Sequence, residues 1–121
     1  MSYDIRFGVK VAGAEDVYAV IGHPEYDSPT YNLHEIFEKS MDWDYSQGEW
    51  YPIKEIIPKI ERGIHELRSN PYLYKQYEPD NGWGTVQSAL NTLESIHAWF
   101  FDKVWMKWDT EIPLECIYMR W

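Results

Sequence analysis

The chain has 121 residues, with 20 acidic and 11 basic side chains and a formal net charge of −9. This is the length of one domain with its own core, and we expect a single domain over residues 1–121. The charge argues against direct binding to nucleic acid or to an anionic membrane, because both require clustered Lys and Arg.

The first predicted elements are two strands that form a hairpin. Residues 3–11 alternate between apolar and polar side chains, which is typical of a strand with one buried face. After a short turn the alternation resumes over residues 17–21. Two prolines and turn-forming residues then predict a loop over residues 22–30.

A first helix is predicted to begin at Asn32. Asn32 is a good N-cap, and Glu35 three residues later completes a capping-box pattern. Residues 42–51 lack helical or strand periodicity, so we interpret them as an aromatic-rich loop. The inward face of this helix is predicted to hold Leu33, Ile36, Phe37, Ser40 and Met41.

The clearest helical pattern lies at the middle of the chain, over residues 52–69. We expect the regular helix to begin near Lys54 or Glu55, because Pro58 fits best in a first turn. Pro71 ends it and is predicted to open a short helical turn over residues 72–77. The predicted buried stripe is Ile53, Ile56, Ile57, Ile60, Ile64 and Leu67.

A last helix and a last strand complete the chain. Thr85 is the predicted N-cap of a helix that runs to about residue 108, with Trp99 away from its buried stripe. The strand covers residues 112–121, and both of its faces are largely apolar. The predicted stripe is Val86, Ala89, Leu90, Leu93, Ile96, His97, Phe100 and Val104. In the strand we expect Leu114, Cys116 and Tyr118 to face the core, and Ile117, Met119 and Trp121 to face outward.

This order of elements predicts an α+β fold with two layers. The elements follow one another along the chain in the order β-β-α-α-α-β. The three strands are expected to form a small antiparallel sheet with the last strand beside the first. The helices are expected to cover one face of that sheet.

A search for catalytic chemistry finds little. The histidines show no metal-binding spacing, and no nucleophile-elbow, phosphate-loop or dinucleotide motif occurs. We therefore expect no enzyme, cofactor or metal. His23 lies in a loop with Glu25 and Asp27, which leaves a small hydrolase as one alternative. Cys116 is the one cysteine, so an internal disulfide and a cysteine-based zinc site are excluded. With no apolar leader and no membrane-spanning run, a cytoplasmic protein is expected.

What stands out instead is the pairing of acidic and aromatic residues in the predicted loops. Tyr and Trp anchor protein interfaces, and carboxylates beside them would attract a basic partner. The alternative is that the aromatics fold back onto the helices and the acids are simply hydrated. The candidate partner-binding residues are Glu25, Asp27, Asp42, Trp43, Asp44, Glu49, Trp50, Glu78, Asp80 and Trp83.

The chain also resembles a known group of proteins. Residues 28–37, 41–51, 77–95 and 112–121 are together similar to small acidic proteins encoded on phages and integrative elements of Gram-positive gut bacteria. The resemblance carries over no site residues. It implies a mobile-element protein, a kind that includes inhibitors of host defence nucleases such as anti-CRISPR proteins, some of which fill a DNA-binding groove with carboxylates.

Three hypotheses follow from the sequence. The first is a non-enzymatic module that binds a basic or nucleic-acid-binding protein, as an acidic inhibitor of the anti-CRISPR or anti-defence type that mimics DNA. The second is a structural protein that self-assembles through Ile117, Met119 and Trp121. The third is the small hydrolase using His23 with Glu25 or Asp27.

Overall fold

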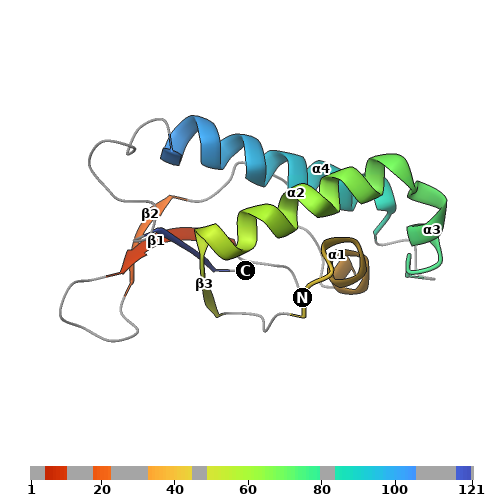
Figure 1. Ribbon diagram of the computed structural model, residues 1–121, viewed down its shortest axis with the longest axis horizontal. Helices are drawn as coiled ribbons and strands as arrows, with labels where there is room; N and C mark the ends of the chain where they lie inside the picture. Colours follow the sequence, from red (N-terminus) through yellow and green to blue (C-terminus); the bar gives the residue numbers. More distant parts are fainter. Residues whose placement is uncertain are drawn as a thin grey trace.

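The computed structural model describes residues 5–10, 18–22, 33–44, 49–79, 84–105 and 117–120. They form an antiparallel sheet and a group of helices, which confirms the α+β class (Figure 1). In the described parts of the chain, no helix has both the length and the apolar character needed to cross a bilayer. The elements are β1 (Arg6–Lys10), β2 (Tyr18–Gly22), α1 (His34–Met41), β3 (Trp50–Pro52), α2 (Ile53–Ser69), α3 (Pro71–Lys75), α4 (Val86–Trp99), the π-helical segment η2 (Phe100–Trp105) and β4 (Ile117–Arg120).

The sheet has four strands, in the order β2-β1-β4-β3. The predicted hairpin is confirmed as β1 and β2, and the last strand does lie beside the first, with Phe7 opposite Met119. The expectation of three strands is wrong because residues 50–52 add a short edge strand, in which Tyr51 also pairs with Met119. A three-residue strand is too short to show a period of two, so hydrophobic periodicity does not predict it.

The predicted faces of β4 are wrong. Ile117 and Met119 are both fully buried, whereas Tyr118 between them is half-buried. The reason is the pairing with β1, which places Met119 on the same face as Phe7, where the helices pack. These two side chains are therefore not available for the predicted self-assembly. Leu114, Cys116 and Trp121 lie outside the described residues.

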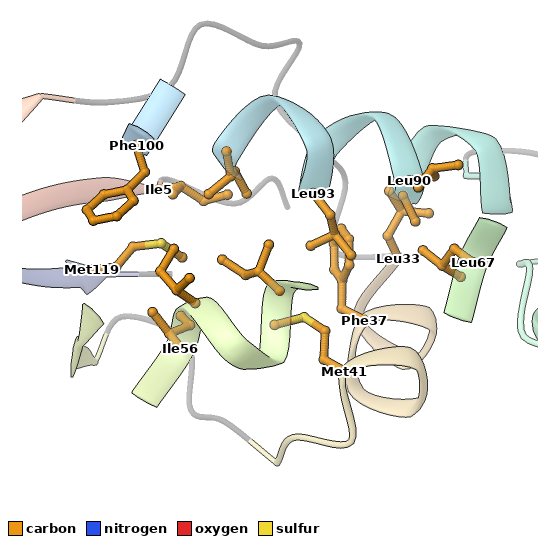
Figure 2. Close-up of a cluster of buried hydrophobic side chains, with 14 of the residues drawn as sticks. Ile5, Leu33, Phe37, Met41, Ile56, Leu67, Leu90, Leu93, Phe100 and Met119 are labelled. Atoms are coloured by element: carbon orange, nitrogen blue, oxygen red, sulfur yellow. The ribbon is translucent and has the colours of Figure 1, made fainter. Parts of the chain in front are cut away.

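The core lies between that sheet face and the helices (Figure 2). The stripe of α2 is buried as predicted, except that Ile64 is half-buried. The inward face predicted for the first helix is buried in full, although the helix begins at His34 and Asn32 lies outside the described residues. The capping interaction predicted at Asn32 is therefore outside what the structure describes.

Pro58 lies inside α2, not in its first turn. The helix begins at Ile53 because β3 leads into it without a loop, and the pairing of Pro52 with Tyr118 fixes that junction. The earlier start also buries Ile53. A proline at this depth cannot donate a hydrogen bond to the carbonyl four residues back. Burial of the Ile53 side chain at the start of the helix offsets part of this cost.

Thr85 is the N-cap of α4 as predicted, because its hydroxyl accepts a hydrogen bond from the Ser88 amide at 3.0 Å. Trp99 is half-buried and lies against the edge of the core, where its ring stacks on Phe7 of β1 with 5.3 Å between centroids. The helix changes at Phe100 to the π-helical η2 rather than continuing as an α-helix. His97 is half-buried at the helix surface rather than in the core.

Three helices meet at Gly63 of α2. A Cβ atom at this position would lie 2.7 Å from Cδ1 of Leu93 on α4 and 2.8 Å from Cγ of Met41 on α1. Both distances are shorter than any carbon contact allows, so glycine sets how closely α1 and α4 approach α2. The side chains that surround it are fully buried.

We predict that Gly63→Ala destabilises the fold by about 1–3 kcal/mol, because overpacking outweighs the gain in helix propensity. Chemical denaturation of the purified variant measures this free energy of unfolding. His65→Ala on the exposed side of the same helix is the control and should change it little. An unchanged or higher stability of Gly63→Ala would contradict the close crossing of the helices.

Tyr74 anchors α3 in the core and is 5 % exposed. Burial, followed by the nearby Glu66 carboxylate, raises the pKa of its phenol above the ordinary value of 10.0. The neutral phenol is thus favoured in the folded state. Above pH 10.0 the unfolded chain releases this proton more readily, so stability falls as the pH rises towards the folded-state pKa.

We therefore predict that Tyr74→Phe flattens the alkaline part of the stability profile. The variant lacks the ionisable group, so its free energy of unfolding should fall less between pH 9 and 11, which bracket the ordinary phenol pKa of about 10. Denaturation at a series of pH values measures both slopes. Tyr72→Phe is the matched control, because Tyr72 is largely exposed. Equal slopes for wild type and Tyr74→Phe would show that Tyr74 ionises normally.

Candidate functional site

The structure brings three of the predicted partner-binding residues together at the C-terminal end of α1. Asp42, Trp43 and Asp44 line a surface depression of about 320 Å³, together with Glu38 and Lys39. We call Glu38, Asp42, Trp43 and Asp44 the acidic corner. Asp42 and Asp44 are exposed, and Trp43 is half-buried.

The backbone at the end of α1 turns sharply to form this corner. Asp42 has φ 51° and ψ 53°, the left-handed conformation that often ends a helix. Its amide and that of Trp43, the latter at 3.1 Å, both donate hydrogen bonds to the Glu38 carbonyl. The chain therefore leaves the helix in one defined direction, with the two aspartates on either side of the tryptophan.

The Trp43 ring is held in place by β3. It packs edge-on against Tyr51, with 4.8 Å between ring centroids and 72° between ring planes. Such aromatic pairs add stability beyond the area they bury. Because Tyr51 belongs to a strand of the sheet, this contact fixes the corner to the body of the protein.

Two cations of α2 stabilise the end of α1. Nζ of Lys59 donates to the Asp42 carbonyl at 3.1 Å. The Arg62 guanidinium donates to the carbonyl of Lys39, at 3.5 Å, and to that of Ser40. The last carbonyls of a helix have no partner within the helix and carry partial negative charge, so cations are favourable there. Neither cation belongs to the predicted buried stripe of α2, and the periodicity of one helix does not indicate contacts with another.

The carboxylates of the acidic corner have fewer partners than the backbone carbonyls at the end of α1. Glu38 pairs with His34 one turn earlier. Across the parts of the chain that are described, no basic side chain pairs with the carboxylate of Asp42 or Asp44. Lys39, the cation nearest in sequence, lies over the Tyr77 ring, 5.9 Å from its centroid. The corner thus presents two exposed negative groups beside a fixed aromatic ring.

The other predicted site residues are placed separately. Glu49 is exposed and Trp50 is half-buried, both at the start of β3. Oε2 of Glu78 accepts a hydrogen bond from the Val86 amide at 2.7 Å, so this carboxylate caps the first turn of α4. Glu25, Asp27, Asp80 and Trp83 lie outside the described residues.

The three described histidines lie at separate places on the structure. His34 pairs with Glu38, His65 is exposed, and Nε2 of His97 lies 3.4 Å from Oε2 of Glu61. No cluster of three or more His, Cys, Asp or Glu that could hold a metal ion occurs in the described ranges. His23 of the hydrolase alternative lies outside them.

Comparison with known proteins adds no relative, because no family model, curated protein or solved structure matches the chain.

We predict that Arg62→Met destabilises the protein by about 1–2 kcal/mol, because hydrogen bonds from a charged group to the α1 carbonyls are lost. Arg68→Met is the matched control. Arg68 forms an exposed ion pair with Glu94, and such pairs contribute about 0–1 kcal/mol. Denaturant titrations compare the two variants. Equal losses would show that Arg62 does not stabilise the end of α1.

Proposed function

We propose that the protein is a non-enzymatic binding module whose acidic corner contacts a basic surface of a nucleic-acid-binding protein. Such a partner exposes clustered Lys and Arg where it meets the phosphates of its nucleic acid. By occupying that surface, the module acts as an inhibitor. This is the anti-defence activity implied by the sequence resemblance.

The observation that carries the proposal is the position of two aspartates at the negative end of a helix. Asp42 and Asp44 follow the C-terminus of α1, the end of the helix dipole at which negative charge is unfavourable. Lys59 and Arg62 are directed at the helix carbonyls rather than at these carboxylates. The preference against carboxylates at a helix C-terminus is a local rule, and such rules are commonly broken at functional sites. An external cation would satisfy both aspartates.

The aromatic ring gives this charge a defined geometry. Trp43 is held against Tyr51, so little side-chain freedom would be lost when a partner packs on it. Tryptophan is also the residue type most enriched among the side chains that dominate interface energies. The corner therefore combines an ordered aromatic ring with two carboxylates that have no basic partner among the described residues.

The overall charge of −9 supports the same choice of partner. A net negative field accelerates the approach of a basic protein and disfavours acidic ones, and salt screens both effects. Binding that depends on the corner should therefore weaken as ionic strength rises.

The test uses a double variant, Asp42→Asn with Asp44→Asn. Asparagine tolerates the left-handed backbone at position 42, so the charge is removed without strain. The control is Glu55→Gln with Asp102→Asn, which removes the same charge from two exposed positions on other elements. Tagged wild type and both variants are used to capture proteins from a Gram-positive lysate in low and in high salt, and captured proteins are tested for nucleic-acid binding.

We expect a nucleic-acid-binding protein that is captured in low salt, is lost in high salt and is displaced by added duplex DNA. Its affinity should fall by about tenfold for the Asp42 and Asp44 double variant and much less for the control. Capture that is insensitive to salt, or equal for the two double variants, would refute the charge-based inhibitor. Recovery of the bait alone would also count against it.

A further inference from the structure

The sheet differs in charge from the rest of the protein. Its four strands contain Arg6, Lys10 and Arg120 and no Asp or Glu, although the whole chain has a formal net charge of −9. The acidic residues of the described ranges lie on the helices and in connecting segments. The sheet is therefore a basic part of an acidic molecule.

The strand register separates the side chains of the sheet into two faces. Phe7 and Met119 lie opposite each other and are fully buried on the face that packs against the helices. Because successive residues of a strand point to opposite sides, Arg6 and Arg120 lie on the other face, which we call the outer face. The two arginines are also directly opposite each other, and each is half-buried, so part of each side chain reaches solvent.

Two arginines in this register are unfavourable for the sheet itself. Like charges directly opposite each other on adjacent strands are destabilising. An anion between the guanidinium groups of Arg6 and Arg120 would attract both and offset their repulsion. The charge of this row therefore favours a negatively charged ligand, the opposite of the preference of the acidic corner.

Aromatic side chains lie next to the arginines on the outer face. Trp50 of β3 is opposite Arg120, on the side away from Arg6, so the three residues form one row across β1, β4 and β3. Tyr118 lies on the same face as Arg120, two residues earlier, and is opposite Gly8, which has no side chain. Both aromatic residues are half-buried. The register alone thus places two guanidinium groups beside an indole.

The arrangement of the row favours one kind of anion. A carboxylate has two oxygens, and a single guanidinium can occupy both through a bidentate pair of hydrogen bonds. A phosphate group has three strong acceptor oxygens, so it can bind two guanidinium groups at once. The indole beside them offers a flat surface on which a nucleobase can stack. A phosphate joined to a planar base, as in a nucleotide, matches all three side chains.

The overall charge favours a free nucleotide over a nucleic-acid strand. A strand would bring further phosphates over a body with a net charge of −9, and binding of a polyanion requires many Lys and Arg. A single phosphate group needs only the two arginines of the row.

We infer that Arg6, Arg120 and Trp50 form a binding site for a free nucleotide on the outer face of the sheet. The phosphate lies between the two guanidinium groups, and the base stacks on the indole of Trp50. The site goes beyond the proposed protein-binding function and does not depend on it, because it uses other residues and a ligand of opposite charge.

The experiment records amide NMR spectra of the isotope-labelled full chain during titration with AMP, inorganic phosphate or adenosine. We expect AMP to shift the amides of residues 6–8, 50–51 and 118–120 with a dissociation constant of about 1 mM or lower. Phosphate alone should bind more weakly, because it lacks the stacking base. Adenosine should bind far more weakly than AMP, because it lacks the anion.

Two variants separate the contributions of charge and stacking. Arg6→Gln should weaken the binding of AMP by about tenfold and weaken that of phosphate as well. Trp50→Leu should weaken the binding of AMP by about fivefold and leave that of phosphate unchanged. Arg68→Gln, the same change at an arginine of α2 that pairs with Glu94, is the control and should bind both ligands like the wild type.

The inference is overturned if about 10 mM AMP, ten times the expected dissociation constant, shifts none of these amides. Equal binding of adenosine and AMP would show that the phosphate contributes nothing. Equal weakening by Arg6→Gln and Arg68→Gln would show a general effect of charge rather than a site. Tighter binding of a single-stranded oligonucleotide than of AMP would refute the free nucleotide, and equal binding of the acidic peptide EDLFDE at the same amides would refute the choice of phosphate.

Discussion

The close crossing of three helices at Gly63 is the constraint on which the rest of the structure depends. Because no side chain separates them there, Met41 of α1 and Leu93 of α4 both reach the surface of α2. The same approach brings the end of α1 next to the basic side chains of α2, so the carbonyls of α1 find hydrogen-bond donors. The position of the acidic corner is thus a consequence of core packing, although the corner itself is exposed.

Much of this fold could be predicted from periodicity, and the exceptions share a cause. The stripes of α2 and α4 follow one helical period, so residues such as Ile56 and Leu93 were assigned to the core correctly. The faces of β4 were not, because both are apolar and pairing with β1 decides which is buried. Strand β3 and the helical position of Pro58 also depend on that sheet. Long-range pairing leaves no local signature in the sequence.

The candidate site was predictable in part for a similar reason. The run Asp42-Trp43-Asp44 is contiguous, so its acidic and aromatic character is visible directly. Lys59 and Arg62 act on carbonyls from α1, far away along the chain, and a pattern of exposed charges cannot name such targets. Composition likewise does not distinguish one acidic residue from another. The Glu78 carboxylate accepts a hydrogen bond at the start of α4, whereas Asp42 and Asp44 have no ion-pair partner among the described residues.

Strand β3 has a further consequence, for solubility. It lies at one edge of the sheet, where unpaired backbone groups can recruit a strand from another molecule. Here the edge spans three residues, its last residue is a proline that has no amide to donate, and the chain then enters α2 at once. An incoming strand would find few backbone groups to pair with. The junction that fixes the start of the central helix therefore also protects this side of the sheet from edge-to-edge aggregation.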